Sequence, residues 1–273
     1  MSTSLSIINK YHDMGLSRNK IKLIRSLKEK KYRDELLLFV AEGDKLVSEL
    51  LKNSRCHFLA ALPEWVNAHP GISAEEIIMA TEAELNRATF MKTPPPVIAL
   101  FHQPNHNAKQ LDLKDGISLA LDGVQDPGNM GTIVRIADWF GIEQIICSND
   151  TADIYNPKTV QATMGAIARV RVIYTDIARF LQQHDQLPVY GTFLDGHNIY
   201  EETLPSTGII VLGSEGRGIS PEVKKRISRR LYIPSFPPGR ATSESLNVAI
   251  AAAIICSEFR RREVRMRTGT IKK

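Results

Sequence analysis

The chain has 273 residues, of which 43% are hydrophobic, and it carries a formal net charge of +5. This composition predicts a globular protein with a proper core, long enough for one large or two ordinary domains. No stretch approaches the ~18 uninterrupted apolar residues of a membrane span, and residues 1–10 lack the apolar core of a signal peptide. We therefore expect neither a membrane-spanning nor a secreted protein.

The basic excess is unevenly distributed, and its position says more than its total. An excess of this size is weak support for a nucleic-acid partner, because charge runs are commonly solvated helix faces. One cluster lies near the N-terminus and comprises Arg18, Lys20, Lys22, Arg25, Lys28, Lys30, Lys31 and Arg33. A second lies near the C-terminus and comprises Arg260, Arg261, Arg262, Arg265, Arg267, Lys272 and Lys273.

The three cysteines, Cys56, Cys147 and Cys256, are far apart in the sequence and odd in number. Each lies in or beside an apolar run, and no pair has a spacing typical of a metal site. This pattern predicts buried free thiols, which suit a reducing cytoplasm.

The first hundred residues alternate helical and extended patterns. Ile21, Ile24 and Leu27 recur every three residues among lysines and arginines, which predicts a helix. A strand-like run at 36–41 interrupts the helical pattern, and further strands are expected at 57–62, 76–80 and 97–101. These elements predict a small α/β domain over residues 1–103, followed by a polar linker at 104–115.

Strand and helix patterns then alternate regularly. Asn156 and Ser220 each precede a proline, which predicts two capped helix starts. Such alternation predicts a parallel sheet with helices on both faces, in a second domain over residues 116–273. The expected strands are 117–121, 144–147, 170–174, 189–194, 208–212 and 231–233. The expected helices are 132–140, 157–167, 177–184, 221–229 and 245–262.

Three segments of the second domain each join an apolar run to a polar or glycine-rich turn. They are 121–137, 210–218 and 233–249, and ligands bind at such strand ends in open α/β sheets. Their order and side-chain content resemble the three signature motifs of the SpoU (TrmH) family of RNA ribose 2′-O-methyltransferases, in the SPOUT superfamily. Residues 20–47 more loosely resemble the substrate-binding domain that precedes the catalytic domain in many members. Thr93 and the three prolines after it depart from that resemblance, since the family often has Thr-Pro-Gln-Gly there.

The resemblance implies that S-adenosylmethionine is the methyl donor and S-adenosylhomocysteine the product. No metal is expected, because the donor already carries a good leaving group. The glycines of 210–218 match neither Gly-x-Gly-x-x-Gly nor a P-loop, which disfavours a nucleotide-dependent oxidoreductase. An ordinary strand–turn–helix corner is the alternative for this loop. The donor-binding residues that the resemblance implies are Thr192, Leu212, Gly213, Gly218, Ile233 and Leu246.

Arg135 is the principal catalytic candidate, because it lies outside the apolar stripe of its helix and matches an arginine to which the family assigns activation of the 2′-hydroxyl. A guanidinium stays protonated, so we expect electrostatic stabilisation and phosphate positioning rather than base catalysis. The alternative is a surface arginine paired with Asp126 or Asp138. Ser245 has an alternative role as a helix N-cap, and Glu215 could pair with Arg135 or orient a loop amide. The catalytic set is Arg135, Asn129, Glu215, Ser245 and Asn247.

The resemblance also implies an RNA partner, either tRNA or rRNA. Phosphate contacts are expected from the N-terminal cluster and from the segment 235–244, which is longer than in many relatives. Segment 157–166 matches a family region beside the active site and often at the subunit contact, with an ordinary amphipathic helix as the alternative. The expected RNA-binding residues are Arg18, Lys20, Arg25, Arg33 and Arg240.

The implied fold is α/β, with a C-terminal parallel-sheet SPOUT domain tied in a deep trefoil knot and a smaller α/β substrate-binding domain before it. A homodimer through residues 115–273 is expected. Two functional alternatives stay open: a base-modifying SPOUT RNA methyltransferase, and a donor-binding or RNA-binding protein without turnover.

Overall fold

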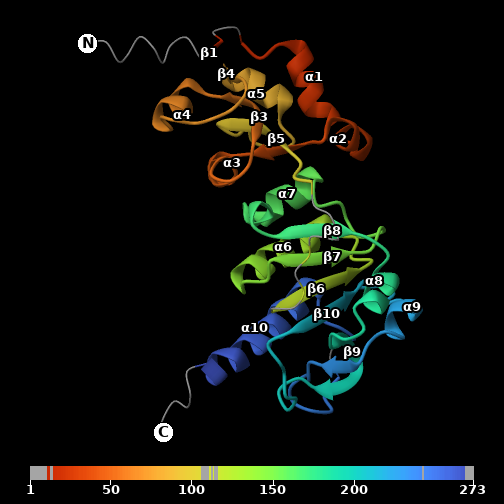
Figure 1. Cartoon of the computed structure of the whole chain (residues 1–273). Coiled ribbons are helices and arrows are strands. Elements are labelled where there is room, and N and C mark those ends of the chain that lie inside the picture. Colours follow the sequence, from red (N-terminus) through yellow and green to blue (C-terminus); the bar gives the residue numbers. More distant parts are fainter. Residues whose placement is uncertain are drawn as a thin grey trace. The chain divides into compact units, whose positions relative to one another are not determined.

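The computed structural model describes residues 11–12, 15–105, 111, 113, 116–241 and 243–267. The chain forms two compact units (Figure 1). The first unit contains Met1–Asn105 and Asp153–Ala168, and the second contains His106–Ala152 and Arg169–Lys273. Segment Asp153–Ala168, which the sequence pattern assigns to the second domain, therefore packs with the first unit. The domain bounds inferred from sequence stay a prediction.

The first unit contains a five-stranded mixed sheet. Strands β1, β4 and β3 run parallel to one another, and β5 is antiparallel to both β3 and β2. All five residues of β2 are buried, as are the first five of β5, because packing covers both faces of these strands. The order across the sheet is β1 (Tyr11–His12), β4 (Ile77–Met79), β3 (Cys56–Ala61), β5 (Val97–His102) and β2 (Leu38–Glu42).

Short helices pack on this sheet. The predicted apolar stripe of the first helix is confirmed, since Ile24 and Leu27 are fully buried and Ile21 packs against the same core. The predicted strand at 36–41 begins instead at Leu38, because Leu36 still belongs to α2 and Leu37 adopts the left-handed conformation that ends it. The helices are α1 (Arg18–Ser26), α2 (Lys30–Leu36), α3 (Asp44–Leu51), α4 (Pro63–Ala68), α5 (Glu82–Ala88) and α7 (Pro157–Thr163).

Two of these helices, α4 and α5, were missed in the sequence pattern. The signal for α5 was present, because Thr81 and Glu84 form a capping box in which each side chain binds the other residue's backbone N–H. The cap predicted for α7 is confirmed, since the Asn156 side chain accepts a hydrogen bond from the Lys158 N–H at 2.9 Å.

The second unit is built on a six-stranded sheet whose neighbouring strands are all parallel, as the alternating pattern predicts. Its central strands β10 and β6 are buried along nearly their whole length, which requires layers on both faces. The order is β11 (Arg229–Tyr232), β9 (Val189–Asn198), β10 (Gly208–Gly213), β6 (Ile117–Asp122), β7 (Gln144–Cys147) and β8 (Arg171–Tyr174).

The helices of this unit differ from the prediction mainly at their ends. The helix expected at 221–229 stops at Lys224, because β11 begins at Arg229, and Ser220 makes no side-chain cap. The last helix begins at Val248 rather than Ser245 and packs against α6 and β10. The helices are α6 (Pro127–Trp139), α8 (Ile177–Gln183), α9 (Pro221–Lys224) and α10 (Val248–Arg267), and the short 3-10 helix η3 (Ala166–Ala168) lies in the first unit.

The prediction of buried free thiols is confirmed, because Cys56, Cys147 and Cys256 are all buried and unpaired. Burial raises the pKa of Cys56 and of Cys256 to about 12, so both stay protonated at neutral pH. Among the described residues, no helix is long and apolar enough to cross a membrane.

Candidate active site

The ends of the central strands of the second unit bring the motif segments together. Gly213 at the end of β10 is paired with Asp122 at the end of β6, so the turns that follow leave the same edge of the sheet. The Asp122 carboxylate accepts a hydrogen bond from the Ser220 N–H at 2.6 Å, which joins the segments that follow β6 and β10. The carboxyl edge of a parallel sheet is the usual place for a ligand site.

A chain of two hydrogen bonds, which joins two side-chain amides and one carboxylate and is called the relay below, connects all three motifs. The Asn129 amide donates to the Glu215 carboxylate at 2.5 Å, and the Asn247 amide donates to the Asn129 side-chain oxygen at 3.0 Å. The partners are 86 and 118 residues apart in sequence. The relay therefore fixes the orientation of both amides and holds the three segments in one constellation.

Asn247 has a second role as the cap of α10. Its side-chain oxygen accepts hydrogen bonds from the N–H groups of Ala249 at 2.9 Å and Ile250 at 3.3 Å. The alternative role of Ser245 as the N-cap is therefore wrong, because the helix begins three residues later, and Ser245 is exposed. One side chain thus anchors the helix with its oxygen and the relay with its nitrogen.

Arg135 lies on α6 with an exposed side chain, and in the described part of the chain its guanidinium has no hydrogen bond or ion pair. Both predicted alternative partners are engaged elsewhere. Asp138 binds Arg169 through two contacts of 2.8 Å, and Asp126 caps α6 by accepting from the Asn129 N–H at 2.7 Å. The surface-pair alternative is therefore not formed, and the guanidinium is available to an external anion.

The glycine-rich turn after β10 folds back on its own strand. The N–H of Gly218 donates to the Ser214 carbonyl at 2.8 Å, and the Ser214 N–H donates to the Gly218 carbonyl at 3.2 Å. A Cβ on Gly213 would lie 2.3 Å from the carbonyl carbon of Gly218, so only glycine fits at position 213. Gly218 itself has φ +66°, in the left-handed region that favours glycine. A Cβ on Gly216 would meet nothing within 4 Å, which leaves that part of the loop backbone open to a ligand.

A second polar cluster at the same edge was missed in the sequence. Arg217 in the glycine-rich turn pairs with Asp150 at 2.6 Å. The Ser148 hydroxyl donates to Asp150 at 2.6 Å and accepts from the Gly123 N–H at 2.9 Å. The Ser148 hydrogen bond and then the Arg217 partner lower the pKa of Asp150. The only sequence signal was the polar run directly after β7.

The comparisons with known proteins agree with this geometry. The model of the SpoU rRNA Methylase family matches residues 116–257, which is more than half of the chain. The chain belongs to the SpoU rRNA methylase family. The resemblance seen in the three motifs is thereby confirmed. A second family model, of an MRM3-like substrate binding domain, matches residues 18–99 of this SpoU protein.

Similar proteins span nearly the whole chain. The 23S rRNA (guanosine(2553)-2′-O)-methyltransferase RlmP of Bacillus subtilis is 29% identical over 248 residues, covering 88% of this chain and 96% of the relative. A solved TrmH-family RNA methyltransferase candidate from Porphyromonas gingivalis is 45% identical, with a TM-score of 0.83 over 91% of this chain and 100% of the other. An AdoMet-bound rRNA methyltransferase from Sinorhizobium meliloti is 28% identical, with a TM-score of 0.80 over 92% and 98% of the two chains.

Of the residues expected to hold the donor, Gly213 and Gly218 form the glycine-rich turn and Leu212 directly precedes it. Thr192 follows the stretch of β9 that pairs with β10, so it is level with Leu212. The Leu212 side chain is fully buried, so apolar contact through it is excluded and only its backbone can face a donor. Ile233 is half-buried and Leu246 is 46% exposed, so both side chains can supply apolar contact. Open backbone and accessible apolar side chains suit an adenosyl group.

The residues of the first unit that are expected to bind RNA differ in how accessible their charged groups are. Arg18 is exposed, whereas Lys20 is paired with Glu76 and lies 4.6 Å from the Phe58 ring centroid. Arg25 donates to the Thr89 carbonyl at 2.6 Å, although its side chain stays accessible. These contacts reduce the freedom of Lys20 and Arg25 without removing their charge.

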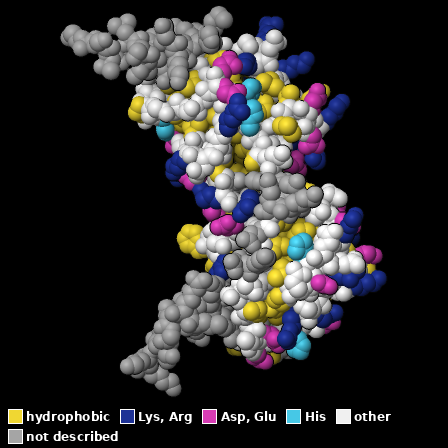
Figure 2. Space-filling model, in the orientation of Figure 1, with side chains coloured by type: hydrophobic (Ala, Val, Ile, Leu, Met, Phe, Trp, Pro, Cys, Tyr) yellow, Lys and Arg dark blue, Asp and Glu magenta, His cyan; other side chains and the backbone are white. Residues whose placement is uncertain are grey.

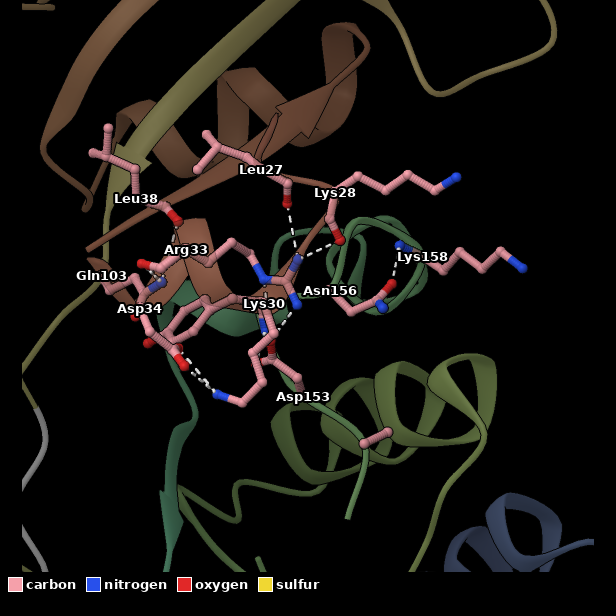
Figure 3. Close-up of polar contacts among 12 residues, drawn as sticks. Leu27, Lys28, Lys30, Arg33, Asp34, Leu38, Gln103, Asp153, Asn156 and Lys158 are labelled. Atoms are coloured by element: carbon pink, nitrogen blue, oxygen red, sulfur yellow. Dashed lines mark hydrogen bonds and ion pairs between the residues drawn. The ribbon is translucent and has the colours of Figure 1, made fainter. Parts of the chain in front are cut away.

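Arg33 was wrongly assigned to RNA binding. Figure 3 shows its guanidinium enclosed by the carbonyl oxygens of Leu27 and Lys28 and the carboxylate of Asp153. The residue is 2% exposed, and its Nη2 lies 2.5 Å from the Asp153 carboxylate. Its charge is neutralised inside the first unit, so it cannot meet a phosphate. Its contacts instead hold segment Asp153–Ala168 in that unit.

Arg240 lies in the exposed segment after β11, and its side chain has no described partner. On the face in Figure 2, Lys and Arg side chains stand among Asp and Glu side chains. The described residues on that face therefore form no continuous basic stripe, and phosphate binding would depend on individual cations. Lys272 and Lys273, at the end of the C-terminal basic cluster, lie outside the described residues.

Proposed function

We propose that this SpoU-family protein transfers a methyl group from S-adenosylmethionine to a ribose 2′-hydroxyl of RNA. The observation that supports the proposal is the hydrogen-bonded relay Glu215–Asn129–Asn247, which unites the three family motifs. Asn129 lies on α6, the helix that also carries the exposed Arg135. The chain is similar over nearly its whole length to a ribose 2′-O-methyltransferase and to an AdoMet-bound rRNA methyltransferase. Both likenesses support the same reaction.

The side chains have separable tasks in this reaction. The bound donor supplies an electrophilic methyl group on a sulfonium, so no metal is required. Arg135 stays protonated and cannot accept the 2′-hydroxyl proton, which passes to solvent water as the methyl group is transferred. The guanidinium instead stabilises the negative charge that develops on the 2′-oxygen or binds the adjacent phosphate. Asn129 and Asn247 orient the nucleotide and the loops without adding charge. The turn after Gly213 holds the donor through backbone groups.

We further propose ribosomal RNA as the substrate class, supported by the named 23S rRNA enzyme that matches 96% of its own length. Two arms would test substrate and reaction together: labelled S-adenosylmethionine with unmodified rRNA, and with unmodified tRNA. After alkaline hydrolysis, label in alkali-resistant dinucleotides of the rRNA arm is the expected result, because a 2′-O-methyl group blocks cleavage at its own phosphodiester. Label only in mononucleotides would mean base methylation and refute the proposal.

The role of Arg135 has its own test. We expect Arg135→Ala to lower the methylation rate at least a hundredfold, because removing one stabilising donor typically costs ~10²–10³ in rate. Arg179→Ala is the matched control, since Arg179 is an exposed arginine on α8 of the same unit. A near-normal rate for Arg135→Ala would contradict the catalytic assignment.

Assembly and topology are proposed on the same family basis. A homodimer through the second unit is supported by Trp139 on α6 and Ile250 on α10, which are 85% and 53% exposed on two helices that pack together. A monomer at micromolar concentration by light scattering would refute it.

The trefoil knot is supported by the return of α10 from the outermost strand β11 to α6 and β10. An experimental trace of 233–248 would test it. Three buried free thiols support a cytoplasmic location.

A further inference from the structure

Three potential metal ligands that the methyltransferase site does not use meet at one end of the first unit's sheet. His57 lies near the start of β3, Glu75 lies just before β4, and His102 is the last residue of β5. Strands β3 and β4 are parallel, and β5 runs antiparallel to β3. The start of β3, the start of β4 and the end of β5 therefore lie at the same end of three neighbouring strands.

The side chains converge on a single carboxylate. His57 Nδ1 lies 2.8 Å from one Glu75 oxygen, and His102 Nε2 lies 3.0 Å from the other. One ligand atom from each residue can be chosen so that all three lie within 4.8 Å of one another. The imidazole rings meet edge to face, with centroids 5.3 Å apart. Each side chain is about one-third exposed, at 35%, 36% and 33%, so an ion can enter from solvent.

Two imidazoles and one carboxylate form a ligand set that suits a borderline transition-metal ion. Zinc binds imidazole nitrogen at ~2.0–2.1 Å and carboxylate oxygen at ~2.0–2.2 Å in tetrahedral geometry. Ligand atoms of such a site are separated by roughly 3.3 Å. The three ligand atoms lie within 4.8 Å of one another, so rotations of these partly exposed side chains would bring them to that spacing around an ion. Oxygen-preferring cations such as Mg²⁺ do not fit two nitrogen ligands.

We propose that His57, Glu75 and His102 form a Zn²⁺-binding site, with water in the fourth position, that joins β3, β4 and β5 at one end of the sheet. The ion is bound by residues from three strands or their immediate flanks, so it stabilises the folded first unit over the unfolded chain. Nothing in this site depends on the methyl-transfer reaction.

The positive charge of Arg55 weakens the binding of a cation at this site. Its Nη2 lies 2.6 Å from Glu75, and its side chain is 75% exposed. The guanidinium occupies one oxygen of the carboxylate and repels a dication. Since it is surrounded largely by solvent, it can swing away when the ion binds. Removing its charge should therefore strengthen zinc binding, whereas a site elsewhere on the protein would not respond.

The test is calorimetric titration of the full-length, chelator-treated protein with Zn²⁺. We expect one ion per chain with micromolar affinity or tighter. His102→Ala and Glu75→Gln should each weaken binding at least tenfold, and Arg55→Ala should tighten it. His197→Ala is the matched control, because His197 is a 76% exposed histidine in the second unit, and its loss should leave the affinity unchanged.

Two further measurements make the result independent of misfolding. Circular dichroism should show each variant folded, as expected for substitutions of partly exposed side chains. Visible absorption of the Co²⁺ form should show the bands of a tetrahedral nitrogen and oxygen site in the wild type and not in His102→Ala. Absence of a zinc titration, or an unchanged affinity in both His102→Ala and Glu75→Gln, would overturn the proposal.

Discussion

Removing the Asp153 carboxylate should destabilise the first unit far more than removing a surface carboxylate. Arg33 donates from Nε at 3.0 Å and from Nη2 at 2.5 Å to one oxygen of Asp153. Its Nη1 donates to the carbonyls of Leu27 and Lys28 at 2.8 and 2.7 Å. Asp153→Ala keeps the two hydrogen bonds from Nη1. It leaves the Nε and Nη2 donors of Arg33, and its positive charge, without the carboxylate partner inside the first unit.

The magnitude follows from the burial of the two partners. The side chain of Arg33 is 2% exposed and that of Asp153 is 16% exposed. Breaking a buried ion pair by removing one partner costs roughly 3–5 kcal/mol, because the remaining charge has lost its compensation. Since water can reach the site of Asp153, we expect the lower end, about 3 kcal/mol in the free energy of unfolding, which is roughly a hundredfold in the equilibrium constant.

The matched control is Asp34→Ala, which breaks the exposed pair of Lys30 and Asp34, 64% and 56% exposed, at the same helix. Its expected cost is below about 0.5 kcal/mol. Urea unfolding followed by the fluorescence of Trp65, which is 6% exposed in the first unit, measures both variants in a Trp139→Phe background, because Trp139 is assigned to the dimer contact. Equal losses for the two variants, or a loss below 1 kcal/mol for Asp153→Ala, would refute the buried-charge argument.

Of three further predictions, two concern the active site and the third concerns the buried acid Glu42. Gly213→Ala should destabilise the fold by ~1–3 kcal/mol and abolish S-adenosylhomocysteine binding in calorimetry, because its Cβ would lie 2.3 Å from the backbone of Gly218, and normal binding would contradict this reasoning. Asn247→Ala should lower the free energy of unfolding by about 1 kcal/mol, because the cap of α10 is lost. Asn247→Asp keeps the capping oxygen but loses the amide donor of the relay, so it should lower the methylation rate without lowering stability. Equal activity of Asn247→Asp and wild type would contradict the role of the relay. Burial raises the pKa of Glu42 above 4.5, so its folded form binds protons more readily than its unfolded form. Stability relative to Glu42→Gln should therefore fall as pH rises from about 4.5 through the raised pKa, as urea titrations across that range would measure.

Much of the fold and part of the site follow from local sequence patterns. The strand at Gln144–Cys147 was predicted with its observed bounds, and β6 and β10 to within one residue. Their apolar runs are bounded by turn residues, and that signal does not depend on distant contacts. Asn129, Glu215 and Asn247 could be singled out because their segments resemble the signature motifs of the family, and such motifs are local sequence patterns.

Tertiary structure alone decided which polar groups meet. The partner of Arg33 lies 120 residues away, so its burial was invisible in a basic run that otherwise suggested a solvated face. The same contact, with Phe39 stacked on Tyr155, holds Asp153–Ala168 in the first unit, although the surrounding sequence belongs to the second. Sequence periodicity determines which residues are apolar and which elements they form. The pairing of buried charges depends on how those elements pack, and that is fixed only when the whole chain has folded.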